Sequence, residues 1–355
     1  MFTNLKIRNL RGFRALDIAS LERVNLFVGT NDVGKTTLLE AVFLLIGETN
    51  IALILKINGF RGLLPKIEGD ASAISDWLWT PLFCGFDTNS VITVQGLWDD
   101  HEHCIELRIV PLASAKLTLD QATSDVRGSG TPITQALQLD YADGDGRSRQ
   151  SKMLVDERGV RVEPPPPLPM VPGYFHAART GFITEEDARN LGQIEVEKKP
   201  FELLKVLQII EPRLKRVSAV VGPGGSMIYG DIGLDRMLPL ALMGDGLARF
   251  TSILLKIATA PHGVVLIDEM ENGFHHAILP RIWQAIAAAA RLFDVQIFAT
   301  THSWECVRAA HEAFSASSLY DFGLHRLETS DDGIRDIAYD RETLDTALTM
   351  ELEVR

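Results

Sequence analysis

The sequence contains only three cysteines, Cys84, Cys104 and Cys306, and their spacing forms no pairs. Chains that depend on disulfides usually carry paired cysteines, so we expect a protein of the reducing cytoplasm. The sequence also lacks an uninterrupted apolar run long enough to span a bilayer. The first residues, Met1–Asn4, do not resemble a signal peptide.

Positive charge is also scarce. The 355 residues include 35 lysines and arginines against 47 aspartates and glutamates, a formal net charge of −12. This balance disfavours broad, sequence-independent binding of nucleic acid by the monomer, although a local basic patch remains open. No long heptad repeat is present, which excludes an extended coiled-coil arm.

One segment, Gly29–Thr36, fits the G-x-x-x-x-G-K-[ST] pattern of phosphate-binding loops. Glycines at both ends let the backbone wrap closely, so that successive N–H groups point at the phosphates. Lys35 supplies a cation for the β- and γ-phosphates, and the Thr36 hydroxyl is suited to ligate Mg²⁺. An apolar helix is predicted to follow, with its N-terminus beneath the phosphates. The expected nucleotide contacts are Gly29, Asn31, Asp32, Gly34, Lys35, Thr36 and Thr37.

A second segment, residues 263–269, is an apolar run that ends in two carboxylates, Asp268 and Glu269. A run without alternation is typical of a central parallel strand that is covered on both faces. We expect Asp268 to hold Mg²⁺ and Glu269 to activate the attacking water as a general base.

A third segment, residues 294–303, is another apolar strand pattern, and it ends in a polar turn that contains His302. Ligands bind at the carboxyl edge of the sheet in open α/β folds. A neutral imidazole at that edge could hydrogen-bond the γ-phosphate or the attacking water. Lys35, Glu269 and His302 are therefore the predicted catalytic residues.

The order of these segments resembles that of ABC-type ATPases, in particular the branch containing SMC, RecF and OLD (overcoming lysogenisation defect) proteins. Asn31 fits the G-x-N-x-x-G-K-[ST] variant of that branch, and residues 5–13 resemble its first strand and turn. Residues 268–276 resemble its Walker B segment, and residues 300–303 resemble its switch histidine. The sequence is also similar to stand-alone AAA-family ATPases of bacterial phage-defence systems, including those paired with TOPRIM-type nucleases.

The resemblance gives a role to a further segment, Leu242–Phe250, which contains Gly244, Asp245 and Gly246. In ABC-type ATPases the corresponding signature opens a helix whose N-terminus meets the nucleotide held by the other protomer. Gly244 stands where the family usually has serine, so one hydroxyl donor to the γ-phosphate is missing. Backbone N–H groups and the helix dipole could still act on the phosphate. As an alternative, Gly-Asp-Gly is a common turn that leads into a helix.

The resemblance implies an α/β fold, a P-loop NTPase with an ABC-ATPase-like head. Such a head combines a mostly parallel sheet flanked by helices with an antiparallel β part. We expect residues 1–46 and 235–355 to form the ATPase core. Residues 47–234 are then an inserted mixed α/β region with strands, a helical stretch and a proline-rich connector at 164–169.

Several patterns within and after the insertion predict local structure. Strands are expected near residues 90–95 and 104–110, and Asp140–Gly146 is a turn signal between hairpin strands. Residues 99–104 are rich in metal-ligating residue types, but a polar hairpin loop is the favoured interpretation. Gln95 is a candidate for the glutamine that senses Mg²⁺ in ABC sites. Short strands are also predicted around 324–327 and 334–339.

Together these observations indicate an ATPase that hydrolyses ATP with Mg²⁺ between two chains arranged head to tail, as a homodimer or a higher homo-oligomer. The favoured role is sensor or motor of a bacterial defence complex with a separate effector protein, of which a TOPRIM-type nuclease is one example. A RecF- or SMC-like role in DNA repair or maintenance is one alternative, and a nucleotide-dependent scaffold without significant turnover is another. No membrane partner is expected.

Overall fold

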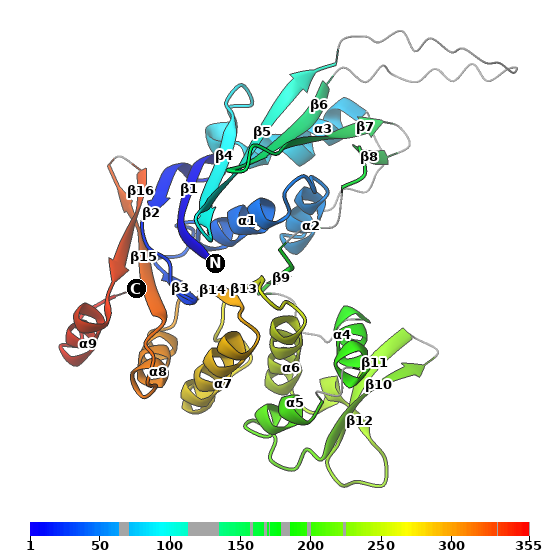
Figure 1. The fold of residues 1–355 in the computed structure, drawn as a ribbon, viewed down its shortest axis with the longest axis vertical. Coiled ribbons are helices and arrows are strands. Elements are labelled where there is room, and N and C mark those ends of the chain that lie inside the picture. The colour runs from blue at the N-terminus through cyan, green and yellow to red at the C-terminus, as the bar shows by residue number, and fades with distance from the viewer. Residues whose placement is uncertain are drawn as a thin grey trace, which may run out of the picture.

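The computed structural model describes residues 1–63, 71–112, 135–156, 159–166, 169, 171–178, 185–196, 200–222, 225–331 and 333–354 (Figure 1). The first half contains the strands β1 (Phe2–Leu10), β2 (Phe13–Ile18), β3 (Val24–Val28), β4 (Ile92–Trp98), β5 (His101–Pro111), β6 (Gln135–Asp143), β7 (Ser148–Asp156), β8 (Gly159–Glu163) and β9 (Gly173–His176). Its helices are α1 (Lys35–Ile46), α2 (Leu53–Phe60) and α3 (Ala71–Trp79).

The second half alternates more regularly between helices and strands. Its helices are α4 (Glu185–Val196), α5 (Pro200–Leu207), α6 (Asp245–Ala258), α7 (Leu279–Leu292), α8 (Trp304–Ser315) and α9 (Arg341–Thr349). Its strands are β10 (Arg216–Gly222), β11 (Gly225–Asp231), β12 (Leu238–Pro239), β13 (Val264–Ile267), β14 (Gln296–Thr300), β15 (Phe322–Ser330) and β16 (Gly333–Tyr339).

The central sheet has six strands in the order β16-β15-β3-β14-β13-β9. Its strands run parallel except at the β15–β16 hairpin. Every residue of β3, β13 and β14 is buried, as expected for strands covered on both faces. The predicted strands at 263–269, 294–303, 324–327 and 334–339 are therefore confirmed as members of this sheet.

A second sheet of seven antiparallel strands has the order β2-β1-β4-β5-β6-β7-β8. The hairpins predicted between β4 and β5 and between β6 and β7 are both present. Residues 99–104 form the β4–β5 turn and the start of β5, and the described residues contain no group of three or more metal-binding side chains. The predicted combination of a mostly parallel sheet and an antiparallel β part is confirmed.

Helix α1 lies between the two sheets and contacts strands of both (Figure 1). Its residues from Thr37 to Ile46 are all buried, and a helix that is buried all round must be apolar on nearly every side. The core around α1 also receives side chains from α2, α3 and both sheets. This packing fixes the position of the helix N-terminus relative to the ends of the parallel strands.

Helices α6, α7 and α8 cover the opposite face of the central sheet (Figure 1). Beside α6 lies a small lobe that consists of α4, α5 and the three-stranded sheet β10-β11-β12. Residues 47–234 thus contribute this lobe except for β12, strands β4–β8 of the antiparallel sheet and edge strand β9 of the central sheet. Parts of the proline-rich connector at 164–169 lie outside the described residues, as does Thr184 before α4.

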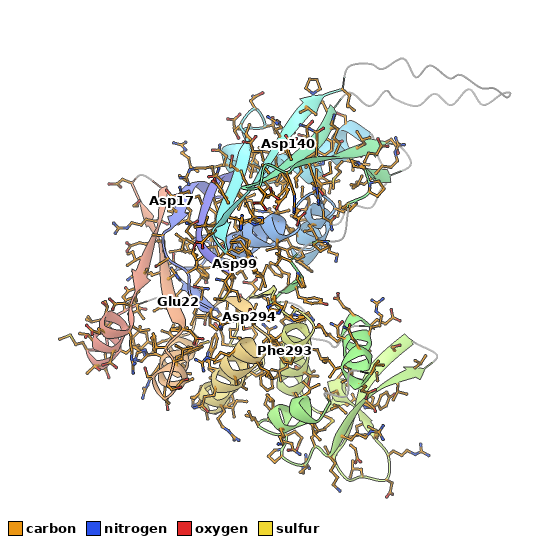
Figure 2. All side chains as sticks on the ribbon, viewed as in Figure 1. Asp17, Glu22, Asp99, Asp140, Phe293 and Asp294 are labelled. Atoms are coloured by element: carbon orange, nitrogen blue, oxygen red, sulfur yellow. The ribbon has the colours of Figure 1, made fainter. Side chains whose placement is uncertain are left out.

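The acidic residues are distributed widely over the molecule. Asp17 and Asp140 lie on the antiparallel sheet, and Asp99 lies at its β4–β5 turn (Figure 2). Asp140 is held by Arg108, Gln138 and Gln150, so part of the negative charge is neutralised locally. No helix in the described ranges is long and apolar enough to cross a membrane.

Candidate nucleotide-hydrolysis site

The predicted site residues converge because three adjacent parallel strands end at the same edge of the central sheet. The phosphate loop follows β3, Asp268 follows β13 and His302 follows β14. Strand β14 pairs with both β3 and β13, so the three chain segments that leave these strands are neighbours. The carboxyl edge of a parallel sheet is the usual ligand position in such folds.

These segments enclose a cavity of about 430 Å³. Its lining residues are Asn31, Asp32, Gly34, Lys35, Thr36, Thr37, Arg61, Asp268, Glu269, Thr300 and His302. Most of the residues predicted from the sequence to act within one chain therefore face a single space. Gly29 and the segment 244–246 are not part of this lining.

The phosphate loop has a backbone that only a few residue types adopt easily. Gly29, Asp32 and Gly34 have φ angles of 142°, 66° and 104°. A Cβ atom at Gly29 would lie 2.5 Å from the carbonyl oxygen of Leu327, so that position is also restricted by space. Gly34 is the N-cap of α1, which turns the first free N–H groups of the helix towards the cavity.

Lys35 extends along the phosphate loop. Its Nζ donates hydrogen bonds to the carbonyl oxygens of Gly29 at 2.6 Å and Thr30 at 2.9 Å. Burial lowers the pKa of Lys35, whereas the nearby carboxylates of Asp268, Glu271 and Glu269 act in the opposite direction. The ammonium group is therefore surrounded by acceptors and can serve as a fixed cation for phosphate oxygens.

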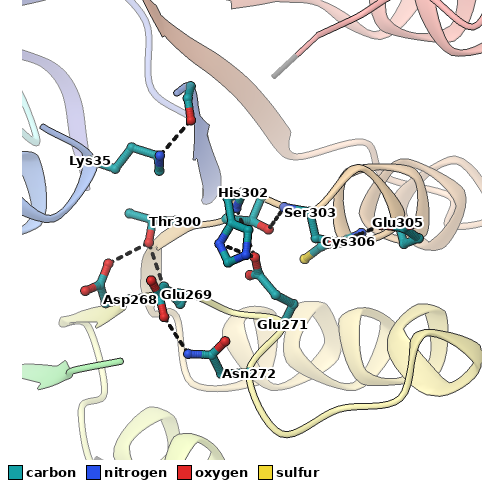
Figure 3. Close-up of polar contacts among 12 residues, drawn as sticks. Lys35, Asp268, Glu269, Glu271, Asn272, Thr300, His302, Ser303, Glu305 and Cys306 are labelled. Atoms are coloured by element: carbon teal, nitrogen blue, oxygen red, sulfur yellow. Dashed lines mark hydrogen bonds and ion pairs between the residues drawn. The ribbon is translucent and has the colours of Figure 1, made fainter. Parts of the chain in front are cut away.

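Asp268 and Thr36 form the pair expected to hold a metal ion. The Thr36 hydroxyl lies 3.1 Å from both carboxylate oxygens of Asp268, and Thr300 Oγ1 donates to Oδ1 at 2.7 Å (Figure 3). Burial raises the pKa of Asp268, and the hydrogen bonds from Thr300 and Thr36 partly oppose that shift. A hydroxyl and a carboxylate fit Mg²⁺, which usually completes its shell with phosphate oxygens and waters.

Glu269 follows Asp268 in a left-handed backbone conformation, with φ of 50°. Its N–H donates to Thr300 Oγ1 at 2.8 Å, and its Oε2 accepts from Asn272 Nδ2 at 2.6 Å (Figure 3). The side chain lines the cavity, as a base that acts on a water in that space requires. Thr300 thus supports both Asp268 and Glu269, a link that the sequence alone did not reveal.

Two arginines of the site were not predicted from the sequence. Arg249 of α6 is buried and donates to the carbonyl oxygens of Asp268 at 2.7 Å and Glu269 at 3.0 Å. Arg61 lines the cavity and is held by Glu40 of α1 at 2.6 Å. For Arg249 the sequence does offer a signal, because an arginine placed among the apolar residues of a helix indicates a buried hydrogen-bond partner.

His302 stands at the cavity with about half of its side chain exposed, and its ring is in contact with Glu271. Gln95 is different, because it lies in β4 against the Cys104 thiol and does not line the cavity. The structure thus does not bring Gln95 to the position where a residue that senses Mg²⁺ would act.

The signature segment begins a helix as predicted. Gly244, with φ of 114°, is the N-cap of α6, and Asp245 lies in its first turn. A Cβ atom at Gly246 would lie 2.5 Å from the carbonyl oxygen of Gly273. The start of α6 is therefore packed closely against the segment that follows Glu269.

Comparisons with known proteins agree with this geometry. A family model described as "AAA ATPase domain" matches residues 1–109, which contain the phosphate loop. A second, described as "AAA domain, putative AbiEii toxin, Type IV TA system", matches residues 143–307, which contain Asp268, Glu269 and His302. The chain is thus similar to AAA-family ATPases over both parts of the site, and it is an ATPase that hydrolyses ATP.

The ATPase is similar along most of its length to a protein from Helicobacter pylori named "ATP/GTP phosphatase". The two are 20% identical over 338 residues, which cover 86% of each chain. Among solved structures it is similar to an SMC head bound to the C-winged helix domain of ScpA, with a TM-score of 0.49, 10% identity and coverage of 98% and 99%. It is also similar to an SMC head from Pyrococcus furiosus, with a TM-score of 0.47, 9% identity and coverage of 99% and 98%.

Proposed function

We propose that the ATPase hydrolyses Mg²⁺-bound ATP between two copies of the chain, each of which supplies half of the site. The convergence of the phosphate loop, Asp268, Glu269 and His302 around one cavity carries this proposal. Lys35 neutralises phosphate charge, Thr36 and Asp268 hold Mg²⁺, Glu269 accepts a proton from the attacking water, and His302 orients that water. Gly29, Asn31, Asp32, Gly34 and Thr37 contribute to the nucleotide cradle.

The partner copy then closes the site with its signature segment. Gly244, Asp245 and Gly246 lie at the N-terminus of α6, where unpaired N–H groups favour a phosphate. Because these residues do not line the cavity of their own chain, they are free to meet the nucleotide of another. ATP would therefore hold a homodimer together, and hydrolysis would release it.

Closure of the dimer would be transmitted through α6 to the lobe of α4, α5 and β10–β12. Lys256 of α6 and Asp187 of α4 form an ion pair at 2.7 Å, and both side chains are buried. Separating a pair of buried charges costs free energy, so a movement of α6 should carry α4 with it. We propose that the region 47–234, which includes this lobe except for β12, presents the surface that binds a separate effector protein.

The biological role that fits best is sensor or motor of an anti-phage defence complex in the bacterial cytoplasm, with a nuclease of the TOPRIM type as one candidate effector. The description of a matching family names a toxin of a toxin–antitoxin system, which supports a role in defence. The resemblance of the sequence motifs to those of OLD proteins and of defence ATPases paired with TOPRIM-type nucleases motivates the effector class. A role in DNA repair or maintenance is the second candidate.

A phage challenge separates the two roles. Cells carrying this gene with its neighbouring reading frames should reduce phage plating, and Lys35→Ala or deletion of the effector gene should abolish that reduction. The purified ATPase alone should not cleave plasmid or single-stranded DNA. Unchanged plating across a phage panel, together with sensitivity to DNA damage after deletion of the gene, would instead favour the repair role.

A further inference from the structure

Glu271 makes two contacts with His302, although the two residues follow different strands of the central sheet. Its Oε1 accepts a hydrogen bond from the main-chain N–H of His302 at 2.9 Å and lies 3.0 Å from Nδ1 of the ring (Figure 3). The Glu271 side chain is 12% exposed, whereas that of His302 is 53% exposed. One oxygen of a largely buried side chain thus holds both the backbone and the ring of an accessible histidine.

This geometry fixes the position of a proton on the imidazole. An ionised carboxylate only accepts hydrogen bonds, so Nδ1 must be the donor in this contact. In the neutral ring Nε2 then carries no proton and is the acceptor. Because the same oxygen also holds the His302 N–H, the ring cannot turn away without giving up one of the two hydrogen bonds. The contact therefore selects both the tautomer and the orientation of the ring.

Glu271 itself is not placed to act on the nucleotide. It does not line the cavity, whereas Glu269 and His302 do. Its second oxygen, Oε2, is buried and has no hydrogen-bond partner among the described residues. A buried carboxylate oxygen without a hydrogen-bond partner lowers the stability of the fold. Glu271 is therefore poorly explained by a role that is only structural.

We propose that Glu271 is a positioning residue that holds His302 as the Nδ1-protonated tautomer, with Nε2 directed at the γ-phosphate or the attacking water. This inference rests on the proposed role of His302. Glu271 acts only through the imidazole, so its loss should reduce turnover without changing how tightly ATP binds. Glu269 remains the general base.

The test combines Glu271→Met, Glu271→Gln and His302→Ala in single and double variants of the full chain, with the ATP dissociation constant and the rate of hydrolysis measured for each. Methionine has a similar length but offers no strong acceptor, whereas the glutamine amide oxygen can still accept from Nδ1. We expect Glu271→Met to lower kcat about 10- to 100-fold, with less than about a threefold change in ATP affinity. Glu271→Gln should recover most of the loss.

The double variants decide whether the effect passes through the imidazole. In the His302→Ala background, Glu271→Met should cause no further loss of kcat, because the group that it positions is already absent. An equal additional loss in that background would overturn the proposal, as would unchanged turnover in Glu271→Met. If Glu271→Met does not fold, Glu271→Gln in the two backgrounds provides the same comparison, with a several-fold loss expected only where His302 is present.

Two controls distinguish this proposal from the function on which it rests. Glu312→Gln removes the same charge from an exposed position of α8 and should leave hydrolysis unchanged. Wild-type turnover in His302→Ala would contradict the proposed role of His302 itself. A slow His302→Ala with a fully active Glu271→Met would contradict only the role of Glu271.

Discussion

At the scale of single residues, the site is a small volume in which several charges depend on one another. Asp268, Glu269 and Glu271 all favour the charged form of Lys35, and burial opposes it. Arg249 adds a further positive charge, because it donates hydrogen bonds to the main-chain carbonyl oxygens of Asp268 and Glu269. Removing one cation therefore changes the balance of charge at the whole site as well as one contact.

Lys35→Ala should abolish measurable ATP hydrolysis and weaken nucleotide binding. The phosphates would lose their fixed cation while the neighbouring carboxylates remain, and we expect a loss of about 100-fold or more in kcat/KM. Titration with a fluorescent ATP analogue and a phosphate-release assay measure the two effects. Hydrolysis at the wild-type rate by a pure sample of this variant would contradict the assignment of the phosphate loop.

At the scale of elements, helix α6 is positioned by close backbone contact as well as by side chains. Its residue Gly246 approaches the carbonyl oxygen of Gly273 so closely that a Cβ atom cannot be accommodated without movement. Together with the Arg249 hydrogen bonds, this contact joins the start of α6 to the segment after β13. The two halves of the predicted site are thereby coupled within one chain.

Gly246→Ala should destabilise the fold by about 1–3 kcal/mol, because the added methyl group forces α6 away from Gly273. Hydrolysis should fall as well, since Arg249 moves with the helix. Gly192→Ala is the matched control, because a Cβ atom there meets nothing within 4 Å in α4 and should leave stability unchanged or higher. Urea unfolding of both variants gives the comparison, and equal stabilities would refute the steric argument.

Strand β9 carries His176, a buried histidine that connects the strand with Asp268 and with helices α4 and α6. Its carbonyl oxygen accepts from the Asp268 N–H at 2.9 Å, and its ring lies near Ser252, Lys256 and Asp187. Burial and, to a smaller extent, the nearby charges of Arg249 and Lys256 lower the pKa of His176 to about 3, whereas Asp187 opposes this shift. The folded protein thus holds this histidine neutral.

Stability should consequently fall on acidification. Between about pH 3 and the ordinary histidine pKa of 6.5, the unfolded chain binds a proton at position 176 that the folded chain does not. Unfolding is therefore favoured as the pH falls through that range. From pH 7.5 to pH 5 the contribution of His176 should lower the free energy of unfolding by about 2 kcal/mol. His176→Gln should remove that part of the pH dependence. Urea unfolding at the two pH values tests this, and an identical pH dependence in both proteins would contradict it.

At the scale of the whole molecule, the proposed dimer depends on the α6 N-terminus, which contacts the segment after β13 but does not line the cavity of its own chain. The cavity opens at the carboxyl edge of the central sheet, and the residues at the N-terminus of α6 do not line it. A head-to-tail pair of chains would bring each α6 N-terminus to the nucleotide of its partner. Because Gly244 offers no side-chain hydroxyl, this contact has to rely on backbone N–H groups.

Glu269→Gln should bind ATP but hydrolyse it slowly, and should therefore accumulate as an ATP-bound dimer. Light scattering with and without ATP and Mg²⁺ should show roughly a doubling of mass only with nucleotide. The double variant Lys35→Ala/Glu269→Gln is the control, and it should stay monomeric under both conditions. A Glu269→Gln protein that turns over normally would transfer the role of the base to another residue.

Local pattern was enough to predict much of this protein. The phosphate loop depends on residues that adjoin one another, so Gly29, Gly34 and Lys35 could be recognised from spacing alone. The apolar runs before Asp268 and His302 predicted buried parallel strands, because a strand covered on both faces cannot alternate between polar and apolar residues. These features identified the ATPase chemistry and most of the side chains that line the cavity.

Contacts between segments far apart in the chain were decided only by the tertiary structure. Which strand joins which sheet depends on the packing of α1 between them, so the sequence could not show that β9 would complete the central sheet or that β4 would hold Gln95 away from the cavity. The partners of Arg249, Arg61 and Glu271 likewise come from other elements. Side-chain types and periodicity describe the surroundings of a residue along its own helix or strand, whereas hydrogen bonds across elements require the strand order and helix positions that folding supplies.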